Sequence, residues 1–303
     1  MRNLHIFFLT LLMIICFLFP SPFPLSGSAL AANPFPQRIV SCMPSITEML
    51  FAIGLDKRIV GVTLNCNYPP AALRKEKVGR EVMNVEKIIS LKPDLVVMLK
   101  SAQPSEIEKL KKRGLPRQAG GLPVMTIDPQ TVHGVMTAII ELGKATGNNQ
   151  QAEKLVAQMQ ARLGKVRRAM GRVQDSPARQ KIAQRESRVL VIVGVNPLVV
   201  VGGNNFIADI IKTAGAKNVA AKLRGPYPQY SFEQLVKDDP DAVIVVKNVV
   251  LGEKEIYNDK RLQKLRAVQN KRVLVIDADI ISRPGPRVVD AVEIIANFLY
   301  AKR

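Results

Sequence analysis

The chain has 303 residues, of which 47% are hydrophobic and 23% charged, and its formal net charge is +19. This composition excludes an intrinsically disordered chain and leaves room for two domains of ordinary size. Residues 149–188 carry ten Lys or Arg against three Asp or Glu. Because no aromatic residues are interleaved with them, this run indicates a solvated helix face, and we expect no nucleic-acid partner.

Residues 1–31 have the pattern of a cleaved signal peptide. Arg2 is followed by the uncharged, mainly apolar run 6–19, and Ala29-Leu30-Ala31 offers a small-residue cleavage site. The run is short for a membrane span of about 20 residues, and Cys16 lacks the small preceding residue that lipidation requires. We therefore predict cleavage before Ala32, secretion, and no membrane insertion afterwards.

Residues 32–148 are predicted to form an N-terminal α/β lobe. Four apolar strands are expected to alternate with four helices in this segment. The second helix begins near Glu86, and Ser45-x-x-Glu48 at the start of the first resembles a capping box. Strands that are apolar throughout indicate a mainly parallel sheet covered on both faces. The predicted strands are 38–43, 58–63, 94–99 and 123–128, and the other helices are 45–53, 104–113 and 132–146.

A long helix is predicted over residues 150–173. Its apolar residues recur three or four positions apart, which gives one stripe along an α-helix. At 1.5 Å per residue it would run roughly 36 Å, long enough to connect two lobes. Residues 174–187 are polar and read as a linker, so 149–187 is predicted to be the bridging segment.

Residues 188–303 are predicted to form a second, similar lobe, because one unit occurs twice. Glu86 and Glu233 each follow an N-cap residue by two positions and precede a Pro by seven, and a strand follows each Pro. A repeated helix–strand unit predicts two similar α/β lobes with a cleft between them. The other expected elements are strands 188–194, 242–246 and 272–277 and helices 204–215, 259–268 and one from about 286.

Two cysteines remain in the predicted mature chain, Cys42 and Cys66. Each lies at or just after the end of a predicted strand, and an oxidising compartment favours a disulfide between them. Two separate thiols are the other possibility. With these two cysteines and His133 as the one mature histidine, we expect no metal site.

Three stretches of the chain resemble periplasmic solute-binding proteins of the vitamin B12 and ferric-siderophore class. They are residues 38–48, 61–70 and 86–96, and the resemblance covers residues 32–303. It implies a monomer in the periplasm whose two lobes are joined by one rigid helix and hold ligand between them. It also implies delivery to an ABC permease dimer with a cytoplasmic ATPase, and Glu86 and Glu233 match the acids that dock onto the permease.

The same resemblance implies a set of ligand contacts. Tyr227, Asp279 and Arg283 match cleft positions of the B12 binders, and Arg80 lies in a loop that faces the cleft. Asn65 and Leu99 stand where the B12 binders usually have aromatic rings. Asn65 and Tyr68 complete the predicted ligand-binding set. The missing rings weaken the case for a corrinoid, whereas the arginines suit an anionic ferric siderophore.

Structural roles without ligand contact are also possible for these residues. Tyr68 and Tyr227 lie beside prolines and could pack in loops, and Asp279 and Arg283 could form a surface ion pair.

An enzyme is the main rival class. The sequence lacks the phosphate-binding, zinc-protease, nucleophile-elbow and dinucleotide-binding motifs. Haem binding usually needs an axial Tyr or His, and the loop after residue 79 offers Arg80. We therefore expect a binding protein, not an enzyme, with no cofactor of its own and a corrinoid or a ferric chelate as ligand.

Overall fold

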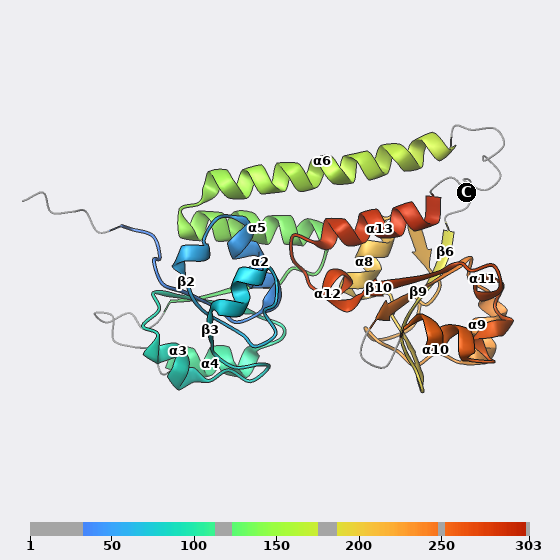
Figure 1. Ribbon diagram of the computed structural model, residues 1–303, viewed down its shortest axis with the longest axis horizontal. Coiled ribbons are helices and arrows are strands. Elements are labelled where there is room, and N and C mark those ends of the chain that lie inside the picture. Colours follow the sequence, from blue (N-terminus) through green and yellow to red (C-terminus); the bar gives the residue numbers. More distant parts are fainter. Residues whose placement is uncertain (1–32, 113–122, 175–186, 248–251, 301–303) are drawn as a thin grey trace, which may run out of the picture. The chain divides into compact units, whose positions relative to one another are not determined.

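The computed structural model describes residues 33–112, 123–174, 187–247 and 252–300 (Figure 1). The predicted signal peptide and most of the predicted linker 174–187 lie outside these residues. Residues 35–303 form one compact unit, which contains all the elements below. No helix in the described ranges is long and apolar enough to cross a membrane.

The first sheet has five strands in the order β3-β2-β1-β4-β5, and every neighbouring pair is parallel. All residues of β1 and β4 are buried, as expected for a parallel sheet covered on both faces. The strands are β1 (Ile39–Ser41), β2 (Ile59–Val62), β3 (Glu76–Lys77), β4 (Leu95–Leu99) and β5 (Val124–Ile127).

The helices of this lobe follow the predicted order. Thr131 caps α5, because its side chain accepts a hydrogen bond from the backbone N–H of Gly134, and the helix ends at Gly147 in the left-handed conformation (φ +74°). The helices are α2 (Pro44–Ala52), α3 (Val85–Ser90), α4 (Pro104–Lys112) and α5 (Val132–Thr146), with 3₁₀ turns at Asp56–Arg58 and Pro70–Arg74.

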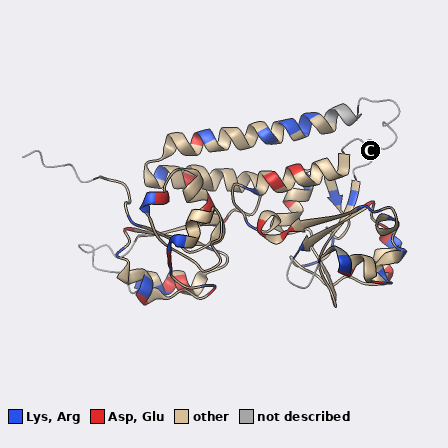
Figure 2. Ribbon diagram, viewed as in Figure 1, with Lys and Arg blue, Asp and Glu red and all other residues tan. Residues whose placement is uncertain are grey.

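The predicted long helix is present as α6 (Asn149–Gln174). It packs along α5 and α13 (Figure 1). Met159, Leu163 and Val166 from its apolar stripe are buried, at 3%, 8% and 8% exposure. Lys and Arg recur along α6 (Figure 2), and Arg162 pairs with Asp290 and Glu293 of α13.

The second sheet repeats the pairing of the first. Strand β6 lies between β8 and β9 and pairs with both in parallel, and β9 pairs with β10. In the first sheet, β1 lies in the same way between β2 and β4, and β4 pairs with β5. One strand, β7, is antiparallel to β6 and was not predicted. The strands are β6 (Ser187–Val195), β7 (Leu198–Val200), β8 (Ala216–Asn218), β9 (Ala242–Lys247) and β10 (Val273–Asp277).

One predicted helix of this lobe, 259–268, is wrong. A 3₁₀ turn (Leu262–Lys264) and the four-residue α11 occupy most of that range, because the extended backbone of Leu265 (ψ 134°) separates them. The helices are α8 (Phe206–Thr213), α9 (Phe232–Asp238), α10 (Glu253–Asn258), α11 (Arg266–Gln269), α12 (Ala278–Ile281) and α13 (Val288–Tyr300).

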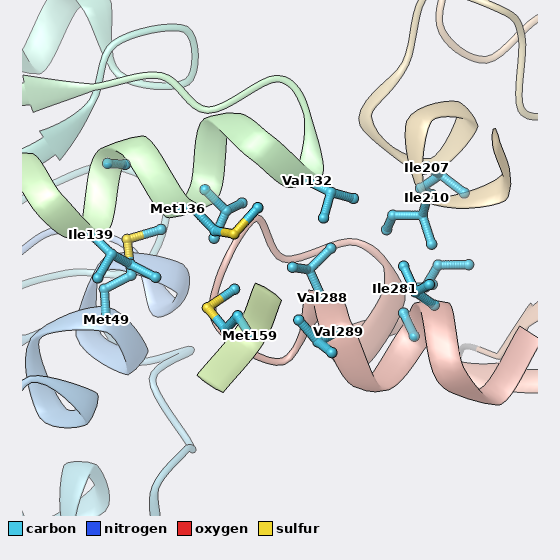
Figure 3. Close-up of a cluster of buried hydrophobic side chains, with 14 of the residues drawn as sticks. Met49, Val132, Met136, Ile139, Met159, Ile207, Ile210, Ile281, Val288 and Val289 are labelled. Atoms are coloured by element: carbon cyan, nitrogen blue, oxygen red, sulfur yellow. The ribbon is translucent and has the colours of Figure 1, made fainter. Parts of the chain in front are cut away.

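The two sheets are separate, which confirms the predicted class of two α/β lobes with mainly parallel sheets. A single hydrophobic cluster nevertheless runs from one lobe into the other (Figure 3). Met49 and Ile139 contribute from the first lobe, Met159 from α6, and Val288 and Ile207 from the second. The lobes therefore share a core beneath α6. The exact domain boundaries, 32–148, 149–187 and 188–303, stay predictions.

Candidate functional site

A cavity of about 620 Å³ opens between the two lobes. Its lining follows the carboxyl ends of β1, β2, β4 and β10, the edge where open α/β sheets bind ligands. The volume lies within the range of roughly 300–1,000 Å³ that is usual for small-molecule sites. The lining residues are Met43, Pro44, Ser45, Leu64, Asn65, Asn67, Arg80, Glu81, Ala102, Gln103, Asp279, Ser282, Arg283 and Pro284.

The structure brings four of the six predicted ligand-binding residues together at this cavity: Asn65, Arg80, Asp279 and Arg283. The exposed Arg80 donates a hydrogen bond from Nη1 to Oδ1 of Asn65 at 3.1 Å. This contact leaves most of the Arg80 guanidinium facing the cavity or solvent, so Arg80 is able to bind an anionic group.

The two predicted tyrosines are not among the residues that line the cavity. Tyr68 is 45% exposed, and its ring lies under the guanidinium of Arg287, with the guanidinium carbon 4.2 Å from the ring centroid. Tyr227 is 50% exposed, in the loop before Tyr230. Leu99, which stands at an expected aromatic position, is buried in the core at the end of β4.

Glu48 is the functional candidate that sequence reasoning missed. It lies in α2 with a side chain only 2% exposed. Its carboxylate accepts hydrogen bonds from Nε and Nη2 of Arg287, at 2.8 and 2.7 Å, and from Nη1 of Arg283 at 3.1 Å. The two arginines belong to the second lobe, so Glu48 joins the lobes directly.

Arg283 has protein acceptors on both of its Nη atoms. Nη1 donates to Oδ1 of Asn67 at 2.7 Å as well as to Glu48, and Nη2 donates to the backbone oxygen of Asn65 at 3.3 Å and lies 2.6 Å from Oδ1 of Asp279. Asn67 also donates from Nδ2 to Asp279 at 2.8 Å. Asp279 and Arg283 are thus part of a network across the two lobes, rather than an isolated surface pair.

The predicted capping box at Ser45 and Glu48 is wrong. The N-cap of α2 is Met43, and no side chain caps the helix. Pro44 occupies the first helical position, a place that suits proline because its missing N–H would have no partner there. Ser45 is therefore already inside the helix. Glu48 turns to the second lobe.

Of the two possibilities for Cys42 and Cys66, the structure has the separate thiols, and both are free and buried. The sulfur of Cys66 instead contacts the hydroxyls of Thr47 and Thr63, at 3.2 and 3.0 Å. Burial, with a smaller contribution from Cys66, raises the pKa of the Cys42 thiol far above its usual value. Cys42 therefore stays protonated at neutral pH. Among the described residues, no group of three or more His, Cys, Asp or Glu is placed to hold a metal ion.

The two predicted docking acids occupy equivalent places in the two lobes. Glu86 and Glu233 are exposed in the first turns of α3 and α9, where the helix dipole stabilises a carboxylate. Asn84 and Ser231 cap these helices through their side chains. In Figure 1, α3 lies on the side of its lobe opposite α6 and α9 at the outer flank of the other lobe.

Two lobes of repeated α/β topology with a ligand-sized cavity between them define a solute-binding protein. The comparison with known families agrees: residues 39–280 match the periplasmic binding protein family, and the chain belongs to that family.

Three known proteins show how far the similarity extends. An uncharacterised ABC transporter substrate-binding lipoprotein of Bacillus subtilis strain 168, YvrC, is 33% identical over 269 residues, 88% of this chain and 80% of the relative. The crystal structure of the periplasmic vitamin B12-binding protein of Vibrio cholerae has a TM-score of 0.71 at 27% identity, over 88% of this chain and 98% of that one. A periplasmic heme-binding protein from Pseudomonas aeruginosa has a TM-score of 0.72 at 25% identity, over 88% and 93%. All three are named as binding proteins.

Proposed function

We propose that this protein is the periplasmic substrate-binding component of an ABC importer, and that it captures a corrinoid in the inter-lobe cavity. The cavity, with walls from both lobes, is the observation that carries this proposal. The similarity to a vitamin B12-binding protein over nearly the whole length of that protein supports the choice of corrinoid. The metal would arrive within the chelate, so the protein would need no metal site of its own.

Within this proposal, Asn65, Arg80 and Asp279 contact the ligand. Of the two arginines that line the cavity, Arg80 has fewer protein partners: its guanidinium donates to Asn65, whereas that of Arg283 is bound by Glu48, Asn67, Asn65 and Asp279. The exposed rings of Tyr68 and Tyr227 lie outside the lining of the cavity and would contact ligand only at its rim.

Delivery would follow docking of Glu86 and Glu233 onto arginines of the permease dimer. Each is an exposed carboxylate at a helix start, and such a group is able to accept a bidentate Arg. Secretion through the predicted signal peptide would bring the protein to the periplasm, where we expect it to act as a monomer.

A ferric siderophore is the second candidate ligand. Arg80 favours it, because an anionic chelate would gain a charge-assisted hydrogen bond from this guanidinium. Both candidates use the same cavity and the same transport mechanism, and they differ in the charge of the ligand.

The test is ligand retention. The chain from Ala32 onward is mixed with cyanocobalamin, with a ferric hydroxamate, with a ferric catecholate or with hemin, then desalted, and its visible spectrum is recorded. Retained corrinoid absorption supports the main proposal, and retained iron-chelate absorption supports the second candidate. Retention of hemin alone, or of no chromophore, would contradict both. Ser45→Trp would place a large side chain in the cavity, so the folded variant should no longer retain the chromophore. This loss would locate the binding site at the cavity.

A further inference from the structure

We propose that Glu48, Arg283 and Arg287 form an inter-lobe clamp that fixes the separation of the two lobes, and with it the size of ligand that the cavity accepts. The second half of this inference rests on the proposed function, and the first half does not. The clamp makes Glu48 a positioning residue for binding, although it touches no ligand.

The clamp joins parts of the chain that lie far apart. Glu48 is in the second turn of α2, and the arginines lie between α12 and α13, 235 and 239 positions later in the sequence. Their side chains are largely excluded from water, at 2% exposure for Glu48, 14% for Arg283 and 18% for Arg287. Hydrogen bonds of 2.7–3.1 Å weaken steeply when distance or angle changes, so these three restrict the relative position of the two lobes.

The clamp is adjacent to the cavity. Ser45, one turn before Glu48 in α2, and Arg283 both line its wall. The backbone of the second lobe also touches α2 here, since a β-carbon at Gly285 would lie 3.5 Å from the backbone oxygen of Ser45 and from Oε2 of Glu48. A change in the clamp therefore changes the distance between the opposing walls of the cavity.

The charges indicate a structural role for the clamp. The carboxylates of Glu48 and Asp279 balance the guanidiniums of Arg283 and Arg287. A ligand anion that took Arg283 as its partner would have to displace Asp279 or break the contact with Glu48. Arg80 avoids this cost because its guanidinium makes one hydrogen bond, to Asn65, among the described residues. Arg80 therefore discriminates between ligands by their charge, and the clamp discriminates by their size.

Packing beneath α6 is the competing explanation for a fixed lobe separation. The shared apolar cluster holds the lobes together at that side, and under this explanation the clamp only follows the geometry that the cluster sets. The two explanations predict different results when the clamp is broken and the apolar cluster is left intact.

The experiment measures the distance between the lobes without ligand. Spin labels are attached at Glu108→Cys in α4 and Lys254→Cys in α10, both exposed positions, and pulsed EPR gives the distance distribution. The native cysteines are buried, and a parent without added cysteines measures any background labelling. Glu48→Gln breaks the clamp, Arg287→Lys keeps its charge but loses the paired contact, and Asp290→Asn is the control, since it weakens the ion pair of Arg162 away from the cavity.

We expect Glu48→Gln and Arg287→Lys to broaden or shift the distribution, and Asp290→Asn to leave it unchanged. A folded Glu48→Gln protein with the parent distribution would overturn the inference, and so would an equal change in Asp290→Asn. If Glu48→Gln does not fold, Arg287→Lys decides alone by the same criterion. The parent and Glu48→Gln are then titrated with cyanocobalamin, for which we expect at least tenfold weaker binding by the variant. A parent that does not bind cobalamin would contradict the proposed function and leave the distance result standing.

Discussion

Removing the Glu48 carboxylate should destabilise the protein far more than removing the carboxylate and its cationic partner together. In Glu48→Met, Arg287 keeps among the described residues the ring of Tyr68, a 3.5 Å contact with the backbone oxygen of Asp279 and a weaker attraction from the Asp279 carboxylate. A buried charge left without its partner costs about 3–5 kcal/mol, whereas an apolar replacement of the whole pair is often close to neutral. Arg283 is spared in both variants, because Asn67 and Asp279 still bind it.

The assay is urea unfolding of the parent, Glu48→Met, Arg287→Met and the double variant, followed by circular dichroism. Glu48→Met should also lower Tm by roughly 6–20 °C, at about 2–4 °C per kcal/mol for a chain of this size. We expect the double variant to recover at least half of the loss. Glu76→Gln is the matched control, because the pair of Glu76 with Lys87 is 60% and 39% exposed, and an ion pair in water contributes little to stability. Losses in the two single variants that simply add in the double variant would refute the reasoning.

Four further outcomes are expected. Glu86→Arg combined with Glu233→Arg should abolish uptake into cells and leave ligand affinity in solution unchanged, whereas the exposed Glu153→Arg on α6 should leave both unchanged; transport that survives the double reversal would refute docking. Arg80→Gln should weaken binding of an anionic ferric siderophore by about 10–100-fold, as for a lost charge-assisted hydrogen bond, and calorimetric titration of the chelate measures this. Met159→Ala should cost about 2–5 kcal/mol in urea unfolding because it opens a cavity beneath α6, and the exposed Gln158→Ala should cost almost nothing. The Arg261 guanidinium holds the pKa of the Asp259 carboxyl below its usual value. This pair therefore stabilises the fold above about pH 4, and the stabilisation is lost as the pH falls through the lowered pKa. The difference in Tm between Asp259→Asn and the parent should shrink over that pH interval.

The features that could be predicted from the sequence are those set by local pattern. The apolar stripe of α6 follows from the 3.6-residue period, and α3 and α9 follow from Asn84 and Ser231, side chains that cap the helices they precede. Four cavity residues were found because a resemblance, and not their own chemistry, pointed to them.

The features that were missed depend on contacts between distant residues. Glu48 fits the sequence pattern of a capping box, but in the structure it binds two arginines more than 230 residues away. Only Pro44 indicated that the helix begins before Ser45. The sequence left a disulfide and two separate thiols both open for the same kind of reason: a pair of cysteines after neighbouring strands meets the sequence condition, whereas a bridge needs a specific geometry between the two side chains.

The positions of the two proposed docking acids and of the clamp indicate how the proposed ligand release would proceed. The lobes are held at two places, by the apolar cluster beneath α6 and by Glu48 with its two arginines at the cavity. Glu86 belongs to α3 and Glu233 to α9, and both helices lie apart from α6 in Figure 1. If Glu86 and Glu233 dock onto a permease as proposed, a change in the spacing of the two docking points would displace the lobes relative to each other and strain the clamp. Because hydrogen bonds weaken steeply outside a narrow range of distances and angles, we expect a small displacement of the lobes to break the clamp before it opens the apolar cluster.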